Sequence, residues 1–486
     1  MIRQSNMASE KPLPDPVNHR RLEFFEQLLH AGNQASALIM TRALLLTGKL
    51  DPQQLELAIQ QVSAQIPLLQ TTIRRQGWQY LLVRSPGHPA PALARRQRQS
   101  DETWQHAAIE SVHRPFEERE PLWRAELIHD PELEMAELVI TFHHAICDGA
   151  SATRLMQWIL QTYHAIGEGR SLDGIVCPQP TDLQPPYITT RWDQFVATLR
   201  FGMANLRQVI RQPVATIFPS DISTTVSIAS RRTVPVFVRF DEAFTSHLVA
   251  RTRREGTRMF GTLCAAMLLA AQEQFDTKPP PLSCFSNIDL RQFNDARVST
   301  ATRDSKWGDS GSKPTEECPS THVAANDFCF GCGAYFVVTR HTELLQHRDR
   351  NPNGFWDVAR SANRKLRNQL MSATAQPPHR ILGPLASSWL RKTLRSSAGG
   401  RTQTIGVSNL GVAHLPSRPD GLQVRGMYSL TGQHGLGPSV MAIAATVNGE
   451  LHATLSFTSP LTGESRRSRF TQDFVKHLRS ATQEKA

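Results

Sequence analysis

Residues 143–149 read HHAICDG, and this stretch decides how the whole chain is interpreted. Residues 137–142 precede it and predict a β-strand, whereas residues 151–166 repeat their apolar side chains at helical spacing. Because side chains alternate across a strand, His143 and His144 point to opposite faces, and only one of them has to face a cleft. Imidazole is the side chain best suited to move a proton near neutral pH. The stretch predicts a strand–loop–helix unit with a candidate general base.

The last two residues of the stretch shape the loop. Asp148 can hold the turn by pairing with an arginine elsewhere, and Gly149 permits a backbone conformation or a close approach that a Cβ would obstruct. A purely structural interpretation makes the histidines a satisfied pair at a strand end and Asp148 a helix cap. We favour the functional interpretation, because His144, Asp148 and Gly149 occur together at a strand–helix junction.

Strands and helices alternate on both sides of this unit. Asp51-Pro52 predicts a helix start, with a capping carboxylate and then proline at the first helical position. Asn448-Gly449 predicts a two-residue hairpin turn. The predicted strands are 37–46, 78–83, 122–128, 137–142, 232–240, 282–290, 440–447 and 451–457. The predicted helices are 51–66, 101–112, 151–166, 262–272 and 470–481.

Breaks in this alternation predict the domain organisation. We expect an N-terminal arm at 1–18, an N-terminal lobe at 19–166 that carries the HHAICDG stretch, and a proline-rich crossing linker at 167–190. A C-terminal lobe follows at 191–486, with a polar, aperiodic insertion at 296–326. The fold class is therefore α/β (α+β).

Composition excludes several classes of protein. The chain has 486 residues, 40% hydrophobic and 20% charged, which is ordinary for a globular protein. The apolar runs fall short of the ~20 residues that cross a bilayer, and no secretory signal is visible, so we expect a cytoplasmic protein without a transmembrane segment. Seven cysteines argue against a disulfide scaffold. The net charge of +11 comes without a basic stripe interleaved with aromatic residues, so nucleic acid is not expected as a partner.

Four further segments, in order along the chain, carry a resemblance to a known family. They are LTGKLD at 46–51, RPF at 114–116, NIDLR at 287–291 and VSNLG at 407–411. Together with residues 143–149, they resemble the HHxxxDG acyltransferase superfamily, which includes chloramphenicol acetyltransferase and the condensation domains of peptide synthetases. The branches that the chain resembles most are the alcohol acetyltransferases and the phthiocerol/phthiodiolone dimycocerosyl transferases. The late DFGWG-type sequence of condensation domains is absent, and the VSNLG segment stands in its place.

The resemblance implies a fold and a set of site residues. The fold would be two chloramphenicol-acetyltransferase-like lobes, each a mixed sheet with helices, around a central cleft or tunnel. His144 would be the general base, with His143 in support and Gly149 setting the loop geometry. Asp148 would be a structural acid, and Arg291 is our candidate for its partner. Ser408 or Asn409 would stabilise the oxyanion of the tetrahedral intermediate, although plain turn chemistry explains these two residues equally well.

The resemblance also implies the reaction and its partners. An acyl group would move from acyl-CoA or an acyl carrier protein to a hydroxyl or amine acceptor, such as a lipid alcohol, in lipid or secondary-metabolite biosynthesis. The acyl-CoA or phosphopantetheine thioester is a co-substrate, and no bound cofactor or metal is expected. We expect a monomer. Two alternatives stay open: a free-standing condensation domain that joins carrier-bound substrates by an amide or ester bond, and a catalytically inactive binding homologue.

One group of three cysteines and a histidine, and one single cysteine, could in principle be metal-binding or reactive. Cys318, His322, Cys329 and Cys332 have short spacings that could suit zinc, but the last two belong to an apolar run and the first two to the polar insertion. We therefore expect no metal. Cys147 lies inside the key stretch, and direct attack on a thioester requires no thiol there.

Overall fold

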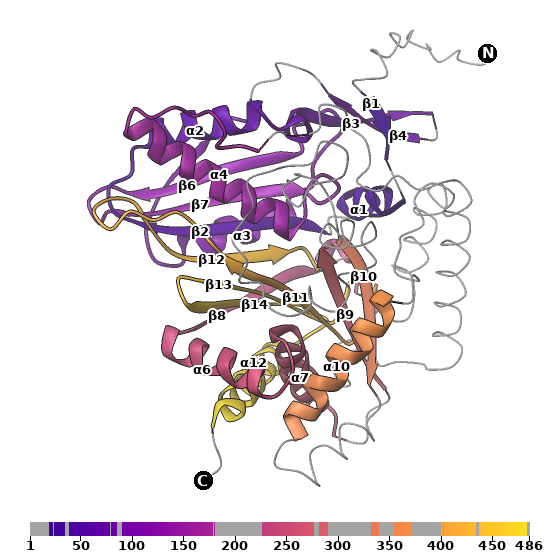
Figure 1. Ribbon diagram of the computed structural model, residues 1–486. Helices are drawn as coiled ribbons and strands as arrows, with labels where there is room; N and C mark the ends of the chain where they lie inside the picture. The colour runs from indigo at the N-terminus through magenta and orange to yellow at the C-terminus, as the bar shows by residue number, and fades with distance from the viewer. Residues whose placement is uncertain are drawn as a thin grey trace, which may run out of the picture.

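A computed structural model describes most of the chain (Figure 1). The arm 1–18, Arg291 and the insertion 296–326 lie outside the described residues, and the linker 167–190 is described only to residue 177 and at 179. The described residues are 19–22, 24–34, 38–77, 79–84, 90–177, 179, 226–276, 281–289, 332–339, 354–371, 400–401, 403–433 and 437–483. Among them, no helix combines the length and the apolar character that a bilayer crossing needs.

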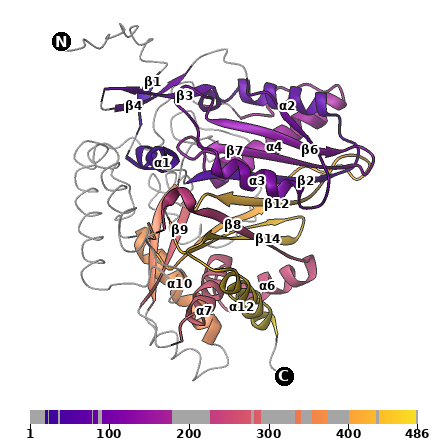
Figure 2. The ribbon, with the colours of Figure 1, turned by 180° about the vertical axis from the view of Figure 1, so that it is seen from behind.

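The upper lobe in Figure 1 is built around a five-stranded sheet of order β12-β2-β7-β6-β5. Helices α2 and α4 cover one face, and α3 covers the other, which Figure 2 shows from behind. A small sheet of order β1-β4-β3 lies beside it, next to α1. The strands are β1 (His19–Arg21), β2 (Ile39–Thr47), β3 (Thr71–Gln76), β4 (Gln79–Arg84), β5 (Ala94–Gln97), β6 (Trp123–Asp130), β7 (Met135–His143) and β12 (Gln423–Thr431). The helices are α1 (Phe24–Gln34), α2 (Pro52–Ala64), η2 (Pro67–Gln70), α3 (Thr103–His113) and α4 (Gly149–Gly167).

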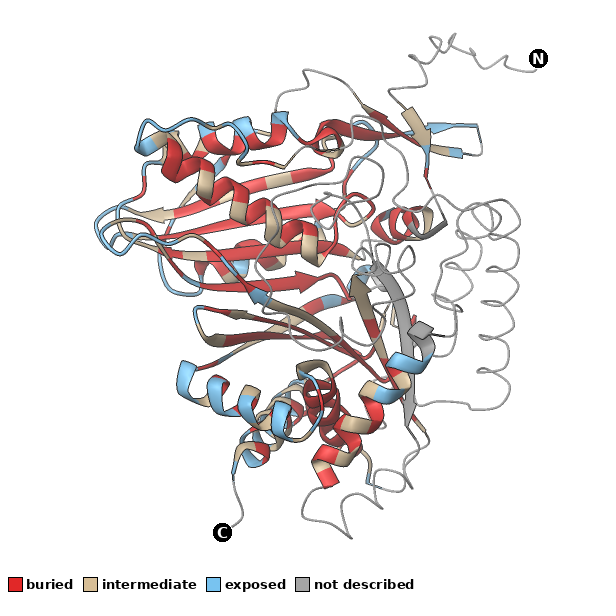
Figure 3. Cartoon of the chain, in the orientation of Figure 1, coloured by how far each residue is buried: buried red, intermediate tan, exposed pale blue. Residues whose placement is uncertain are grey.

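Helix α2 begins where the sequence predicts. Asp51 caps it, because its Oδ1 accepts the backbone N–H groups of Gln53 at 2.8 Å and Gln54 at 3.3 Å. The apolar face that the spacing predicts is buried, as the red stripe on α2 in Figure 3 shows. It consists of Leu55, Ala58, Ile59 and Val62. The predicted helix start is confirmed.

The lower lobe contains a mixed six-stranded sheet of order β10-β9-β11-β13-β14-β8. Strand β11 pairs in parallel with β9 and β13, and the other pairs are antiparallel. The helices lie on the face turned away from the upper lobe, and α7 is almost completely buried beneath them. The strands are β8 (Arg232–Phe240), β9 (Leu282–Asp289), β10 (Cys332–Thr339), β11 (Ile405–Ala413), β13 (Val440–Val447) and β14 (Glu450–Ser459). The helices are η3 (Ile228–Ser230), α6 (Glu242–Arg254), α7 (Met259–Gln272), α10 (Gly354–Met371) and α12 (Glu464–Thr482).

Strand β12 joins the two lobes. It comes from the C-terminal half of the chain, yet it pairs antiparallel with β2 as the edge strand of the upper sheet. Leu422, Val424 and Met427 belong to the core of the upper lobe. The hydrophobic core around α2 and α4 therefore requires residues from both halves of the sequence, a feature that the sequence analysis did not anticipate.

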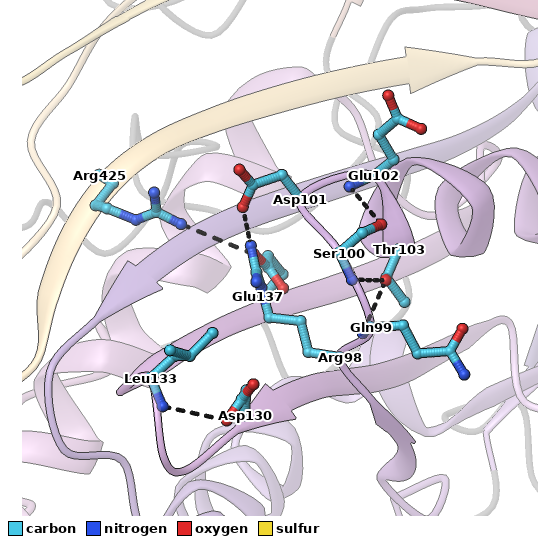
Figure 4. Close-up of polar contacts among 10 residues, drawn as sticks. All are labelled: Arg98, Gln99, Ser100, Asp101, Glu102, Thr103, Asp130, Leu133, Glu137 and Arg425. Atoms are coloured by element: carbon cyan, nitrogen blue, oxygen red, sulfur yellow. Dashed lines mark hydrogen bonds and ion pairs between the residues drawn. The ribbon is translucent and has the colours of Figure 1, made fainter.

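A buried carboxylate fastens β12 to β7 (Figure 4). Glu137 is 1% exposed, and its Oε1 accepts from Arg98 Nε at 3.1 Å and lies 3.8 Å from Arg425 Nη2. Arg98 also pairs with Asp101, just before α3. The register of β12 shifts between Val424 and Gly426, so Arg425 is the extra residue of a bulge. Burial raises the pKa of Glu137, and the two arginines oppose that rise. The ion cluster thus links β12, β7 and the start of α3.

The hairpin of β13 and β14 turns at the predicted dipeptide. Asn448 and Gly449 have φ values of 49° and 81°, as a two-residue turn with two left-handed positions requires. Asn448 Nδ2 donates to the carbonyl of Val424 at 2.6 Å, beside the bulge of β12. The turn therefore closes the hairpin and also holds the crossing strand.

Gly449→Ala should destabilise the protein by about 1–2 kcal/mol, because an L-residue is strained at this positive φ. The added Cβ would also lie 2.8 Å from Glu242 Cγ. Urea unfolding measures the change. Gly421→Ala is the matched control, since the nearest atom to its Cβ would be Arg418 Cβ at 3.4 Å. Equal unfolding midpoints for the two variants would show that the turn is not strained by a side chain.

Candidate functional site

The HHAICDG stretch forms a tight turn between β7 and α4, as the sequence predicts. Strand β7 ends at His143, and α4 begins at Gly149. The backbone N–H of Ile146 donates to the carbonyl of His143 at 3.1 Å and closes the turn. Asp148 Oδ1 accepts the N–H of Ser151 at 2.9 Å and caps α4. The turn therefore has a fixed backbone at both ends.

His144 is half-buried on this turn, and its hydrogen bond defines its tautomer. Nδ1 lies 2.8 Å from the carbonyl oxygen of Cys147. A carbonyl only accepts, so Nδ1 carries the proton, and in the neutral ring Nε2 keeps its lone pair. Burial lowers the pKa of His144 below its usual 6.5, although the bond to Cys147 and the charge of Asp148 oppose the shift. At pH 7 the ring is neutral, with Nε2 able to accept a proton.

His143 points to the other side of β7 and is fully buried. Its Nδ1 accepts the N–H of Ala145 at 3.1 Å, and its Nε2 lies 3.1 Å from Nδ1 of His30 in α1. Burial, together with the positive charges that His30 and His144 would carry, holds the pKa of His143 well below its usual range. His143 is therefore closed off from solvent, and its supporting role stays a prediction.

Arg42 of β2 is a residue of the site that the sequence analysis missed. It is fully buried, and its Nη2 donates to the carbonyl of Gly149 at 3.0 Å while Nη1 contacts Thr153. Burial lowers its pKa to about 10, and the carboxylate of Asp148 is close enough to oppose this shift. The sequence offered one signal for this residue: Arg42 is the only charged residue of the predicted strand 37–46. Arg291 is outside the described residues, so its pairing with Asp148 stays a prediction.

The VSNLG segment meets the HHAICDG stretch at Gly149. Leu410 of β11 places its side chain where a Cβ on Gly149 would lie, so the glycine is needed for this close approach. Leu410 lies within a register irregularity of β11 between Asn409 and Val412, and Gly411, the next residue, has a φ of 74°. The structure thus brings together two segments that are about 260 residues apart in the chain.

The two oxyanion candidates differ in their surroundings. Asn409 Oδ1 accepts the N–H of Gly411 at 3.1 Å, which is the turn chemistry considered for this residue. Ser408 is half-buried on β11, opposite Ile443 of β13. The oxyanion role of Ser408 or Asn409 stays a prediction.

The surroundings of Cys147 do not suit a nucleophile. The residue is fully buried, and its Sγ donates to the carbonyl of Asp148 at 3.4 Å. Of the possible zinc ligands, Cys318, His322 and Cys329 lie outside the described residues, and only the backbone of Cys332 is described. Elsewhere in the described ranges, no group of three or more His, Cys, Asp or Glu side chains could hold a metal ion.

A groove of about 480 Å³ opens further along the seam between α4 and β11. It is lined by Gln157 and Gln161 of α4, by residues 412–416, and by Asn448 and Gly449 of the hairpin turn. His144 is not part of its lining. The groove is therefore a feature of the lobe boundary and is separate from the imidazole.

Gly149→Ala should cost about 1–3 kcal/mol of stability, because the new Cβ overpacks the contact with Leu410. The double variant Gly149→Ala/Leu410→Ala should recover part of this loss, since the smaller side chain leaves room. A double-mutant cycle of urea unfolding measures the coupling. Strict additivity of the two single changes would contradict the contact between the two motifs.

Comparisons with known proteins agree with this architecture. Residues 19–178 match the family model described as the condensation domain, and residues 229–302 match the C-terminus of phthiocerol/phthiodiolone dimycocerosyl transferase. A linear gramicidin synthase protein from Brevibacillus parabrevis is 27% identical over 277 residues, 54% of this chain and 5% of that protein. Chondramide synthase cmdD from Chondromyces crocatus is 27% identical over 279 residues, 53% of this chain and 7% of that protein. The chain thus spans a small fraction of the length of these curated relatives.

Solved structures share the fold along nearly the whole chain. The first condensation domain of the CDA synthetase has a TM-score of 0.68 at 12% identity, covering 97% of this chain and 98% of its own. The trichothecene 15-O-acetyltransferase TRI3 from Fusarium sporotrichioides has a TM-score of 0.67 at 11% identity, covering 98% and 100%. Polyketide synthase associated protein 5 from Mycobacterium tuberculosis has a TM-score of 0.60 at 16% identity, covering 94% and 97%.

The fold is that of chloramphenicol-acetyltransferase-like proteins, as the sequence predicts. Residues 19–178 and 229–302 each match a family model from the group of acyltransferases and condensation domains, which supports the resemblance described from the sequence.

Proposed function

We propose that the protein transfers an acyl group from a thioester to a hydroxyl or amine acceptor, with His144 as the general base. The observation that carries the proposal is the 2.8 Å bond from His144 Nδ1 to the Cys147 carbonyl. It leaves Nε2 as the basic nitrogen of a half-buried ring. The position of His144, Asp148 and Gly149 on one turn supports the same role.

In the proposed reaction, His144 on this turn accepts a proton and later returns it, so no other proton acceptor is needed. His144 Nε2 takes the proton of the acceptor while the acceptor oxygen or nitrogen attacks the thioester carbonyl. The tetrahedral intermediate collapses, the carbon–sulfur bond breaks, and the leaving thiolate takes the proton back from Nε2. The Cys147 carbonyl and the charge of Asp148 favour the transient imidazolium, since both raise the pKa of His144. Proton transfer and alignment can together supply most of the acceleration, because the thioester is already activated.

The relatives support one kind of acceptor. A 15-O-acetyltransferase and the dimycocerosyl transferase model point to a hydroxyl acceptor, as does the VSNLG segment at 407–411. The donor would be acyl-CoA or an acyl carrier protein, with a lipid or polyketide-derived alcohol as the acceptor.

A free-standing condensation domain is the second candidate. It is favoured by the condensation-domain model at 19–178 and by the two curated synthases. Such a domain would take both substrates from carrier proteins and form an amide or ester. Turnover of acyl-CoA with a free alcohol supports the first candidate, whereas strict dependence on two loaded carriers supports the second.

His144→Ala should lower kcat about 10²–10⁴-fold, the usual contribution of a positioned general base. The assay presents the purified protein with a panel of acyl-CoA and acyl-carrier thioesters and with alcohol and amine acceptors, and mass spectrometry detects the product. His106→Ala, an exposed position on α3, is the matched control and should leave the rate unchanged. Wild-type rates in the His144 variant would contradict the proposed mechanism.

The rate should also depend on pH in a defined direction. Burial lowers the pKa of His144, so the ring stays neutral at pH 7 and gains a proton only below its usual value of 6.5. The acid limb of kcat/KM should therefore have its midpoint below 6.5, with a plateau at neutral pH. A pH series with a fixed thioester measures it. A midpoint above 6.5 would mean that the Cys147 carbonyl and Asp148 outweigh burial, which would contradict the lowered pKa of His144.

A further inference from the structure

We propose that His30 of α1 is a positioning residue for the reaction, acting through His143 on the turn that carries His144. The inference rests on the proposed function, because it assigns His30 a role in that reaction. His30 is 3% exposed, and its Nδ1 lies 3.1 Å from His143 Nε2. Their rings are stacked with centroids 5.3 Å apart.

The hydrogen bonds define where each proton lies. The N–H of Ala145 can only donate, so His143 Nδ1 accepts with its lone pair and His143 Nε2 carries the proton. His30 Nδ1 must then accept from His143, which leaves the His30 proton on Nε2. Gln34 Nε2 lies 3.3 Å from that nitrogen, and because an amide N–H only donates, this contact adds no hydrogen bond to His30 Nε2 in this tautomer. The Ala145 N–H, His143 and His30 therefore form a row of two hydrogen bonds, both donated in the direction from the motif turn to α1.

Both rings of this row are neutral. Burial lowers the pKa of His30 to about 4, and the pKa of His143 is held well below its usual range by burial and by the neighbouring His30 and His144. A charged ring at either position would put a proton on both of its nitrogens, and one bond of the row would be lost. The neutral pair is thus the form that keeps the Ala145 N–H paired.

Helix α1 is itself held in place, so His30 can act as a fixed acceptor. Asn33 exchanges two bonds with the backbone of Phe116, in which Nδ2 donates at 2.8 Å and Oδ1 accepts at 2.9 Å. The ring of Tyr80 packs edge-on against His30 with centroids 4.5 Å apart. Asn33 and His30 thereby tie α1 to the RPF segment and to the motif turn.

The row acts on the peptide next to the candidate base. Ala145 directly follows His144, so the direction of its N–H sets the orientation of the peptide plane between the two residues. A small misplacement of a catalytic group can cost about 10²-fold in rate. Loss of the acceptor on His30 should therefore lower kcat and leave substrate binding nearly intact.

Two variants of similar size separate the acceptor from the volume of the side chain. His30→Asn keeps an acceptor oxygen near the place of Nδ1, whereas His30→Leu removes the acceptor and keeps a buried side chain. We expect kcat to fall at least about 10-fold in the Leu variant, with KM within about twofold, and to stay within about threefold of wild type in the Asn variant. If the Leu variant does not fold, His30→Met tests the same loss of the acceptor.

Hydrogen exchange gives a readout that does not depend on turnover. The amide of Ala145 should exchange faster in His30→Leu than in wild type and should stay protected in His30→Asn. If the wild-type protein turns over no thioester, the proposed function fails, and the exchange data still decide whether His30 holds the turn. His106→Asn and His106→Leu on exposed α3 are the matched controls and should change neither quantity.

The route through His143 is tested by a double-mutant cycle. His30→Leu should have little further effect on kcat or on Ala145 exchange when His143 is already replaced in His143→Leu. Equal rates and equal amide protection in His30→Asn and His30→Leu would overturn the proposal. So would a full effect of His30→Leu in the His143→Leu background.

Discussion

The site depends on the short turn that takes the chain from β7 into α4. The strand is an inner member of its sheet and the helix packs on the face of that sheet, so the five residues between them have little freedom. Within this turn, the His144 side chain donates to the Cys147 carbonyl, and the Asp148 side chain caps the helix. These two local bonds fix the backbone and also select the nitrogen of His144 that stays unprotonated. The turn thus presents a half-buried imidazole whose tautomer is defined, and burial keeps it neutral.

The turn is also the place where the two lobes meet. Arg42 of the upper sheet donates to the Gly149 carbonyl, and Leu410 of the lower sheet occupies the space that the missing Cβ leaves. Strand β12, held by Glu137 and Arg425, makes the upper sheet depend on the C-terminal half. A change in the relative position of the lobes would therefore alter the contacts of Gly149 at the start of α4. This arrangement suits a reaction whose two substrates have to be aligned at one imidazole.

Much of the fold could be predicted from the sequence because its signals are local. Asp51-Pro52 and Asn448-Gly449 encode a helix start and a hairpin turn in adjacent residues, and both appear as predicted. Helix α1 and strand β12 were missed because their partners are distant: His30 meets His143, and β12 pairs with β2. Arg42 was missed for the same reason, since its burial against Gly149 depends on tertiary packing. The candidate base was found from the motif, whereas its tautomer required the geometry.

The most direct test of the central claim is the protonation state of one ring. Nitrogen-15 NMR of the histidine-labelled protein, with His144 assigned by its loss in His144→Ala, distinguishes protonated from unprotonated ring nitrogens. At pH 7 we expect a neutral His144 with the proton on Nδ1 and none on Nε2. A proton on Nε2 alone, or a doubly protonated ring at this pH, would contradict the account of how the turn prepares the base.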